Sequence, residues 1–307
     1  MLLILTTSYC WTANVLEELC SKKSIRVFRL NFDRYCDYKF LFSDDRFEII
    51  NAQGIILRSH EISHVVSYKA RLPIEEAFPA DIQIQDVKWV RSTLNYIVYC
   101  ITKWAIQHSC LKLWTPYEFL YPKSSQMDVA KKYFSVPPYN IHWGFRMESK
   151  NVIVKSLIAR PFDNKGFLFA KILDVNSLSS KYPWFTQEIA SGNRDATIVY
   201  INGNVHAYQF AVERNGLTDW RITQGTTDNR WTHWDCGDEF ERKVRTYMRD
   251  VGLKFGRLDF IIGGSAPQFL EVNPCGQFGW LDDSSMTLHK EVVEAIMDPS
   301  SKIEPPV

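Results

Sequence analysis

The sequence predicts a mixed α/β protein built from several lobes. Short apolar runs alternate with helically spaced stretches from the first residues onward, and later apolar runs come in pairs separated by turn residues. Hydrophobic residues make up 46% of the 307 residues and aromatic residues 14%, far from the polar, aromatic-poor composition of disordered chains. This length allows one large domain or two to three lobes with shared interfaces.

Residues 1–115 are expected to form an N-terminal β-α-β lobe. The run LLILTT is followed by TANVLEELCSKK, whose apolar residues have helical spacing, and then by IRVFRL. The stretch FEIINAQGIILRS predicts a hairpin with NAQG as its turn. A long periodic segment without Gly or Pro, DVKWVRSTLNYIVYCITKWAIQ, predicts a helix that is largely buried along one side.

Residues 116–186 predict a small α+β middle lobe. SSQMDVAKKYF begins with serines that can cap a helix, and the double proline of SVPPYNI ends that helix. NVIVKSLI and GFLFAKIL then predict neighbouring strands joined by ARPFDNK.

Residues 187–307 predict a C-terminal lobe in which strands and helices are mixed. WFTQEIA leads into this lobe, and DATIVYINGNVHAYQFAV predicts a hairpin with NGN as its turn. The helix GDEFERKVRTYMRDVGL, the strands RLDFIIGG and PQFLEVNP, and a last helix near SSMTLHKEVVEAIM follow.

Charge and cysteine content exclude several classes of protein. The net charge of +1 argues against a general nucleic-acid binder, because such proteins need excess positive charge to track phosphates. The seven cysteines are scattered and form no C-x-x-C, so the reduced thiols of a cytoplasmic protein fit better than a disulfide framework or a zinc ribbon. The apolar start lacks a basic leading segment, so we expect neither export nor membrane insertion.

The stretch FLEVNP carries an acid and an amide two residues apart at the end of an apolar run. Because side chains alternate along a strand, Glu271 and Asn273 should project to one face while Leu270 and Val272 project into a core. A hairpin through GGSAPQ would bring Asp259 close to Glu271, which is costly unless a cation neutralises both. Such oxygen ligands suit Mg²⁺ with substrate phosphates. The alternative is that each acid bonds only to loop amides or surface lysines.

RLDFIIGGSAPQFLEVNPCGQ resembles the last conserved block of ATP-grasp enzymes. The resemblance implies an ATP-grasp fold with an N-terminal pre-ATP-grasp lobe, a small middle lobe and a C-terminal lobe. It implies that Asp259, Glu271 and Asn273 hold the magnesium ions of bound ATP. It also implies that Lys123 and Lys155 contact the phosphates, although a solvated lysine is the ordinary alternative for each.

FTQEIASGNRDATIV resembles the hinge between the lobes of these enzymes. The resemblance implies that backbone groups from Gln187 through Glu188 to Ala190 read the adenine edge, and that Asp195 takes the ribose hydroxyls. Arg257 resembles an arginine that meets the phosphate or the oxyanion in many relatives, and its ordinary alternative is a surface ion pair.

The closing GQFGWLD resembles a narrower group, the ligases that build graspetides, which are microviridin-type side-chain-linked peptides. TDWRIT resembles a second motif of that group, and Arg221 within it is expected to hold the acyl phosphate or the incoming carboxylate, which its planar fork fits. The chain departs from the group at Thr197, where many relatives have an arginine. It also departs at SYKARLP, where Lys69 and Arg71 would replace paired arginines beside a tryptophan.

These resemblances imply an ATP-grasp ligase that uses ATP and Mg²⁺. The expected reaction first converts an Asp or Glu side chain of a precursor peptide to an acyl phosphate. A Ser or Thr hydroxyl or a Lys amine of the same peptide then attacks this group and closes a macrocyclic ester or amide. The expected partner is a precursor peptide with a leader and such a core, without nucleic acid or membrane, and a homodimer is left open. Two alternatives remain: a stand-alone ligase that forms a linear amide, and a nucleotide-binding protein without turnover.

HEISH, from His60 to His64, matches the H-E-x-x-H of zinc proteases. That chemistry requires both histidines on one helical face, Glu61 as the base and a third ligand downstream. The stretch follows the strand GIILRS and runs into the β-branched VVSY, so we expect extended structure and surface or half-buried histidines.

Overall fold

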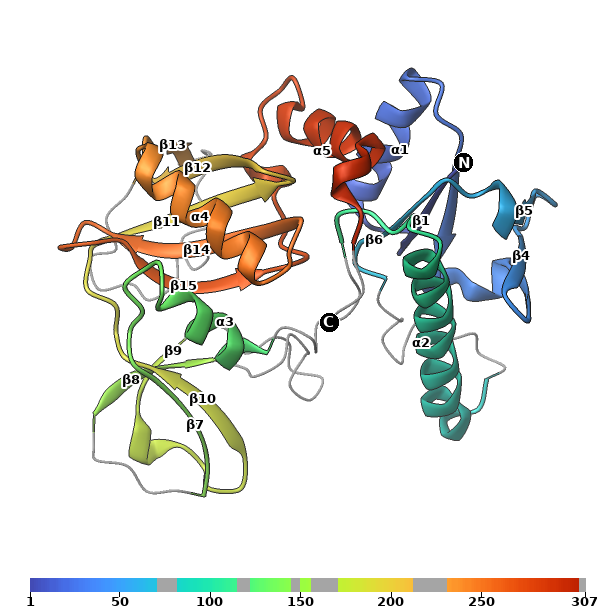
Figure 1. The fold of residues 1–307 in the computed structure, drawn as a ribbon. Coiled ribbons are helices and arrows are strands. Elements are labelled where there is room, and N and C mark those ends of the chain that lie inside the picture. The colour runs from blue at the N-terminus through green and yellow to red at the C-terminus, as the bar shows by residue number, and fades with distance from the viewer. Residues whose placement is uncertain (71–81, 115–121, 145–149, 156–170, 212–230, 304–307) are drawn as a thin grey trace.

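The computed structural model describes residues 1–70, 82–114, 122–144, 150–155, 171–211 and 231–303 (Figure 1). Within these ranges the chain forms four β-sheets and five α-helices, so the predicted mixed α/β class is confirmed. Short 3₁₀ turns lie between them: η1 (Phe32–Asp37), η2 (Ser59–Glu61), η5 (Val175–Ser177), η7 (Gly279–Leu281) and η8 (Pro299–Ser301). None of the described helices is long and apolar enough to cross a membrane.

The N-terminal lobe is built on a parallel three-stranded sheet with the order β2-β1-β6. Every residue of its central strand is buried, because α1 packs on one face of the sheet and α2 on the other. The predicted β-α-β opening and long helix are therefore confirmed. In chain order the elements are β1 (Leu2–Thr6), α1 (Trp11–Lys22), β2 (Val27–Asn31), β6 (His64–Ser67) and α2 (Ile84–Gln107).

A small antiparallel sheet extends this lobe, with the order β3-β4-β5. It contains the predicted hairpin, in which Gly54 has a φ of 78° and donates its N–H to the carbonyl of Asn51 at 2.9 Å. A positive φ at this point of a tight turn favours glycine, which has no Cβ. The strands are β3 (Lys39–Ser43), β4 (Arg46–Ile50) and β5 (Ile56–Arg58).

The middle of the chain forms an antiparallel four-stranded sheet with the order β7-β10-β8-β9. The predicted neighbouring strands are present as β8 and β9, although part of the second predicted run lies outside the described residues. One face of the sheet packs Val152 and Val154 on Val175, and the other turns Phe185 toward α3. The strands are β7 (Tyr139–Trp143), β8 (Asn151–Lys155), β9 (Lys171–Asp174) and β10 (Pro183–Gln187).

The C-terminal lobe is an antiparallel five-stranded sheet with the order β13-β12-β11-β14-β15. In Figure 1, α4 lies across this sheet and α3 lies beside β15, and both pack on the same apolar face. The predicted hairpin β11–β12 and the two predicted helices of this lobe are confirmed. The elements are β11 (Arg194–Ile201), β12 (Asn204–Phe210), β13 (Trp231–His233), α4 (Asp238–Asp250), β14 (Phe255–Ile262), β15 (Gln268–Asn273) and α5 (Thr287–Met297).

Helix α3 (Lys123–Ala130) starts one residue before the serines that we expected to cap it, and its N-cap is Pro122. Met127 and Ala130 join Tyr247 and Phe269 in one core. The helix therefore packs with the five-stranded sheet, although the sequence groups it with the middle lobe. The boundaries at residues 115 and 186 stay a prediction.

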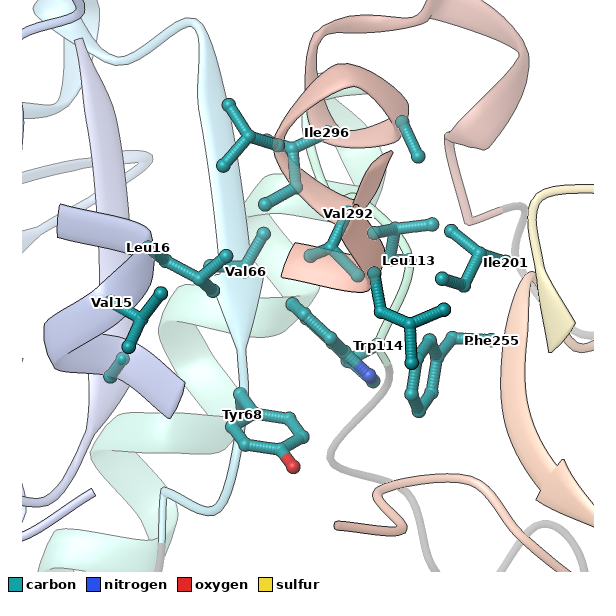
Figure 2. Close-up of a cluster of buried hydrophobic side chains, with 14 of the residues drawn as sticks. Val15, Leu16, Val66, Tyr68, Leu113, Trp114, Ile201, Phe255, Val292 and Ile296 are labelled. Atoms are coloured by element: carbon teal, nitrogen blue, oxygen red, sulfur yellow. The ribbon is translucent and has the colours of Figure 1, made fainter. Parts of the chain in front are cut away.

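An apolar cluster joins the N-terminal lobe to the C-terminal sheet (Figure 2). Trp114 is completely buried, and its ring centroid lies 4.7 Å from that of Tyr68 and 5.1 Å from that of Phe255. Val292 of α5 packs in the same cluster. The end of the N-terminal lobe is thereby fixed against the strands that carry the polar residues described below.

Replacing Trp114 with Ala should destabilise the fold by about 3–5 kcal/mol, because it removes a fully buried indole and leaves a cavity between two lobes. Trp114→Phe should cost much less, since a ring remains between Tyr68 and Phe255. Urea unfolding followed by tryptophan fluorescence and circular dichroism measures both. Equal stability of Trp114→Ala and the unmodified protein would show that the cluster does not hold the lobes together.

Candidate active site

The hairpin of β14 and β15 sets the geometry of the candidate site. Asp259 lies directly opposite Glu271, and Arg257 lies directly opposite Asn273. Since the two pairs are two residues apart on each strand, all four side chains project from the same face of the sheet. The predicted closeness of Asp259, Glu271 and Asn273 is therefore present in the backbone register.

A β-bulge interrupts this hairpin just beyond Asp259. The register shifts between Asp259 and Phe260, so Leu270 is an extra residue with no partner of its own. Phe269 and Val272 fill the core, whereas Leu270 is only half-buried. The expectation that Leu270 projects into the core was wrong, because strict alternation along the strand does not allow for an inserted residue.

Glu271 is held by a lysine from another part of the chain. Lys123, the first residue of α3, places its Nζ 3.0 Å from Glu271 Oε2, and the two side chains are only 22% and 25% exposed. Burial raises the pKa of Glu271, but Lys123 and then Lys155 outweigh it, so the pKa lies well below the usual range. Glu271 is therefore ionised at neutral pH.

Lys155 reaches the same place from the four-stranded sheet. Its Nζ lies 3.1 Å from Gln187 Oε1, on the face of that sheet that also carries Phe185. The Nζ of Lys123 lies 5.8 Å from the centre of the Phe185 ring. One lysine from helix α3 and one from the four-stranded sheet thus face the acids of β14 and β15.

Arg257 and Asp259 form a buried ion pair two residues apart on β14. The Nη2 of Arg257 lies 2.9 Å from Asp259 Oδ2 and its Nε lies 3.2 Å from Oδ1. The arginine is only 6% exposed, and its Nη1 also donates to the carbonyl of Gln277 at 3.1 Å. Burial lowers the pKa of Arg257, but Asp259 more than offsets this and the net pKa is raised, so the guanidinium stays charged.

Gly276 allows the chain after β15 to approach Arg257. A Cβ on Gly276 would lie 2.6 Å from the Cβ of Arg257, which is closer than packed side chains come. The carbonyl of Gly276 accepts a hydrogen bond of 3.3 Å from the buried hydroxyl of Tyr68 in the N-terminal lobe. The N-terminal lobe therefore contacts the same loop that covers Arg257.

The predicted hinge begins at the end of β10. The N–H of Glu188 donates to the carbonyl of Pro138 at 2.8 Å, and its carboxylate pairs with Lys150 at 2.7 Å. Gln187 and Ala190 are buried, but Ile189 between them is 48% exposed. The N–H of Glu188 is thus already hydrogen-bonded. The carbonyl of Glu188 and the backbone groups of the following residues are left as candidates for contacts with the adenine base.

The remaining predicted site residues are distributed as follows. Asp195 is buried on β11 and projects from the same face as Thr197, two residues further on. Lys69 has its Nζ 5.5 Å from the centre of the Tyr68 ring. Arg221 and Arg71 lie outside the described residues.

Two residues that the sequence analysis did not assign to the site support it directly. The Oε1 of Gln126 accepts a hydrogen bond of 3.3 Å from the N–H of Val272, between Glu271 and Asn273. Gln126 follows Lys123 by three residues, so both project from one side of α3, and that spacing was the available signal. Thr197 donates its hydroxyl to Asp259 Oδ1 at 2.9 Å.

The HEISH stretch does not form one α-helix. His60 lies in η2 and His64 begins β6, so the two histidines are not one helical turn apart. Glu61 accepts the N–H of Arg58 at 2.9 Å, and His64 Nδ1 lies 2.9 Å from the Ser63 hydroxyl. In the described ranges no group of three or more His, Cys, Asp or Glu side chains is placed to bind a metal ion.

The oxygen cluster on the hairpin fits a hard divalent cation. Two carboxylates face each other across the strands. Within the described residues, the Oδ1 of Asn273 accepts one N–H, that of Cys275 at 3.2 Å, so a second lone pair remains. Two carboxylates and an amide oxygen suit Mg²⁺ better than zinc, which prefers nitrogen and sulfur ligands.

Gly276→Ala should destabilise the protein by about 1–3 kcal/mol, because the new methyl group cannot fit against Arg257 unless the loop moves. Cys275→Ala at the neighbouring position is the control and should cost less. Thermal unfolding of both variants measures the difference. A Gly276→Ala protein as stable as the unmodified one would show that the close approach to Arg257 is not required.

Comparison with solved structures identifies the fold. No protein-family model matches the sequence, and no curated protein matches it. Among solved structures, the chain is similar to a RiPP-associated ATP-grasp ligase of Chryseobacterium gregarium in complex with ADP and a leader and core peptide, with 19% identity and a TM-score of 0.79 over 100% of this chain and 99% of that one.

Two further structures show the same likeness. The macrocyclase MdnC of Microcystis aeruginosa MRC, bound with its precursor peptide MdnA, has 18% identity and a TM-score of 0.78 over 96% of this chain and 99% of that one. The ATP-grasp ligase PsnB, complexed with a phosphomimetic variant of a minimal precursor, Mg and ADP, has 13% identity and a TM-score of 0.71 over 97% of this chain and 98% of that one. The chain therefore has the ATP-grasp fold that its sequence predicts.

Proposed function

We propose that this chain is an ATP-dependent ligase that closes macrocyclic ester or amide links between side chains of a ribosomally made precursor peptide. One observation carries the proposal: the ion pair of Lys123 with Glu271, opposite Asp259, lies between two sheets of an ATP-grasp fold. The solved structures of similar fold that are named for a leader peptide, a core peptide, ADP or Mg support the same assignment.

The lysines and acids of the site would bind a nucleoside triphosphate and its cation. Without a nucleotide, Lys123 bonds to Glu271 and Lys155 bonds to Gln187. Nucleotide binding would transfer both ammonium groups to phosphate oxygens and leave Glu271, Asp259 and Asn273 to hold the cation. Bound Mg²⁺ would supply neutralisation of the charge that develops on the transferred phosphoryl group.

The base and ribose of the nucleotide would bind beside the hinge. The exposed side chain of Ile189 offers an apolar surface for a base. The carbonyl of Glu188 and the N–H of Ala190 would read the adenine edge, and Gln187 would keep Lys155 in place. Asp195 would accept hydrogen bonds from the ribose hydroxyls.

The reaction would proceed in two steps without an enzyme nucleophile. A carboxylate oxygen of the peptide attacks the γ-phosphorus, the bond to the bridging oxygen breaks, and ADP leaves. A hydroxyl or amine of the same peptide then attacks the acyl carbon, loses its proton, and expels phosphate. Among the described residues, Arg257 uses three of its five N–H groups on Asp259 and Gln277, and the other two would stabilise the developing oxyanion. We propose that Arg221 holds the acyl phosphate.

The proposed partner is a precursor peptide with a leader and a core that contains Asp or Glu together with Thr, Ser or Lys. The net charge of +1 gives the chain no charge excess that would favour nucleic acid or a membrane surface, and we propose neither as a partner. None of the seven cysteines, all of which the structure describes, forms a disulfide, which together with the use of ATP is consistent with a cytoplasmic enzyme. A homodimer is compatible with the proposal.

Glu271→Gln should reduce turnover at least about 100-fold while the protein stays folded, because the amide keeps the shape of the side chain but loses the charge that faces the cation. Glu294→Gln is the control, because Glu294 of α5 is exposed and pairs with Lys23 at the end of α1. ADP release and circular dichroism measure the two effects. Full turnover by Glu271→Gln would remove Glu271 from the reaction.

Incubation with ATP, Mg²⁺ and a leader-bearing peptide rich in Thr and Glu tests the reaction itself. Each new link should lower the peptide mass by that of one water, since the carboxyl group loses OH, whose oxygen leaves with phosphate, and the acceptor loses H. Tandem mass spectrometry locates the links. Gain of an amino-acid mass would instead indicate a ligase for linear amides, and ATP binding without ADP release would indicate a nucleotide-binding protein.

A further inference from the structure

Thr197, Asp259 and Glu271 form a straight row across three neighbouring strands. Thr197 of β11 is directly opposite Asp259 of β14, which is directly opposite Glu271 of β15. Thr197 is only 1% exposed.

The two acids of the row differ in how many of their oxygen lone pairs are used. A carboxylate offers about four acceptor positions. Oδ1 of Asp259 accepts from Thr197 at 2.9 Å and from Arg257 Nε at 3.2 Å, and Oδ2 accepts from Arg257 Nη2 at 2.9 Å. Within the described part of the chain, Glu271 accepts only from Lys123, through Oε2. Asp259 thus has one position left, on Oδ2, whereas Glu271 has several.

We propose that Thr197 is a positioning residue that restricts Asp259 to a single ligating oxygen and so favours Mg²⁺ over Ca²⁺ at this site. The proposal rests on the proposed function, because it concerns the cation of the same nucleotide site. Mg²⁺ demands six ligands in near-ideal octahedral geometry, whereas Ca²⁺ accepts six to eight oxygens and often takes both oxygens of one carboxylate. An aspartate whose Oδ1 is occupied by two donors cannot serve as a two-oxygen ligand.

The hydroxyl of Thr197 also fixes the rotation of the carboxylate. Arg257 alone binds Asp259 along one edge, and the guanidinium is itself anchored on the carbonyl of Gln277. Thr197 approaches from the opposite neighbouring strand, and its single proton is directed to Asp259 Oδ1 at 2.9 Å in preference to the more distant carbonyl of Leu258 at 3.3 Å. Two donors from different strands hold the plane of the carboxylate better than one.

The test compares Thr197→Val and Thr197→Ala, which lack the hydroxyl, with Thr197→Ser, which keeps it. Valine has nearly the shape of threonine and suits a buried strand, so the fold should be retained. The matched control is Thr232→Val on β13, an exposed threonine of the same sheet whose side chain projects from the opposite face. Calorimetric titration of ADP at a series of free Mg²⁺ or Ca²⁺ concentrations gives the half-saturating concentration of each ion.

Thr197→Val and Thr197→Ala should each raise the half-saturating Mg²⁺ concentration about tenfold, as expected for one hydrogen bond to a charged group. The Ca²⁺ requirement should change less, so the preference for Mg²⁺ should fall, and Thr197→Ser should restore it. An unchanged Mg²⁺ requirement, or an equal loss with both ions, would overturn the role of Thr197 while leaving the ligase assignment intact. ADP binding by the unmodified protein with no dependence on a divalent ion would overturn the ligase assignment and this proposal together.

Discussion

The register of one β-hairpin determines the rest of the site. Because β14 and β15 pair with Asp259 opposite Glu271, two carboxylates face each other across neighbouring strands, where like charges destabilise a sheet. The chain offsets this repulsion with one cation for each acid, Arg257 for Asp259 and Lys123 for Glu271. Both cations come from partly or fully buried positions, so their effect is weakened little by solvent.

The five-stranded sheet can carry this charged cluster because its other face is a continuous apolar core. Leu258, Phe260 and Phe269 pack there against α3 and α4. On the charged face, Ile201 and Phe255 at one end of the strands pack against α5 and Trp114 (Figure 2). The polar groups are therefore concentrated in the half of the face nearest to Lys123, and the packing on both sides of the sheet fixes their positions.

Local patterns predicted the hairpins, the helices and the shared face of Glu271 and Asn273, because alternation and turn residues act between neighbours in the sequence. They did not predict the bulge at Leu270, which depends on packing around Phe269. Nor did they predict that Thr197 would bond to Asp259, since that contact requires the pairing of β11 with β14 across more than fifty intervening residues. The ligands of the site came from resemblance, but their hydrogen bonds follow only from the three-dimensional register.

Two parts of the candidate site are coupled through hydrogen bonds and must move together, whereas a third lies on another sheet. Lys123 begins α3, and Gln126 of the same helix binds the backbone of β15 through Val272. Any shift of α3 would therefore move Lys123 and the strand that carries Glu271 as one unit. Lys155 comes from a different sheet, where its Nζ lies 3.1 Å from Gln187 Oε1. A change in the angle between the two sheets would thus move Lys155 relative to the acids while leaving Lys123 in place, so the distance between Lys155 and Glu271 depends on how the two sheets are arranged.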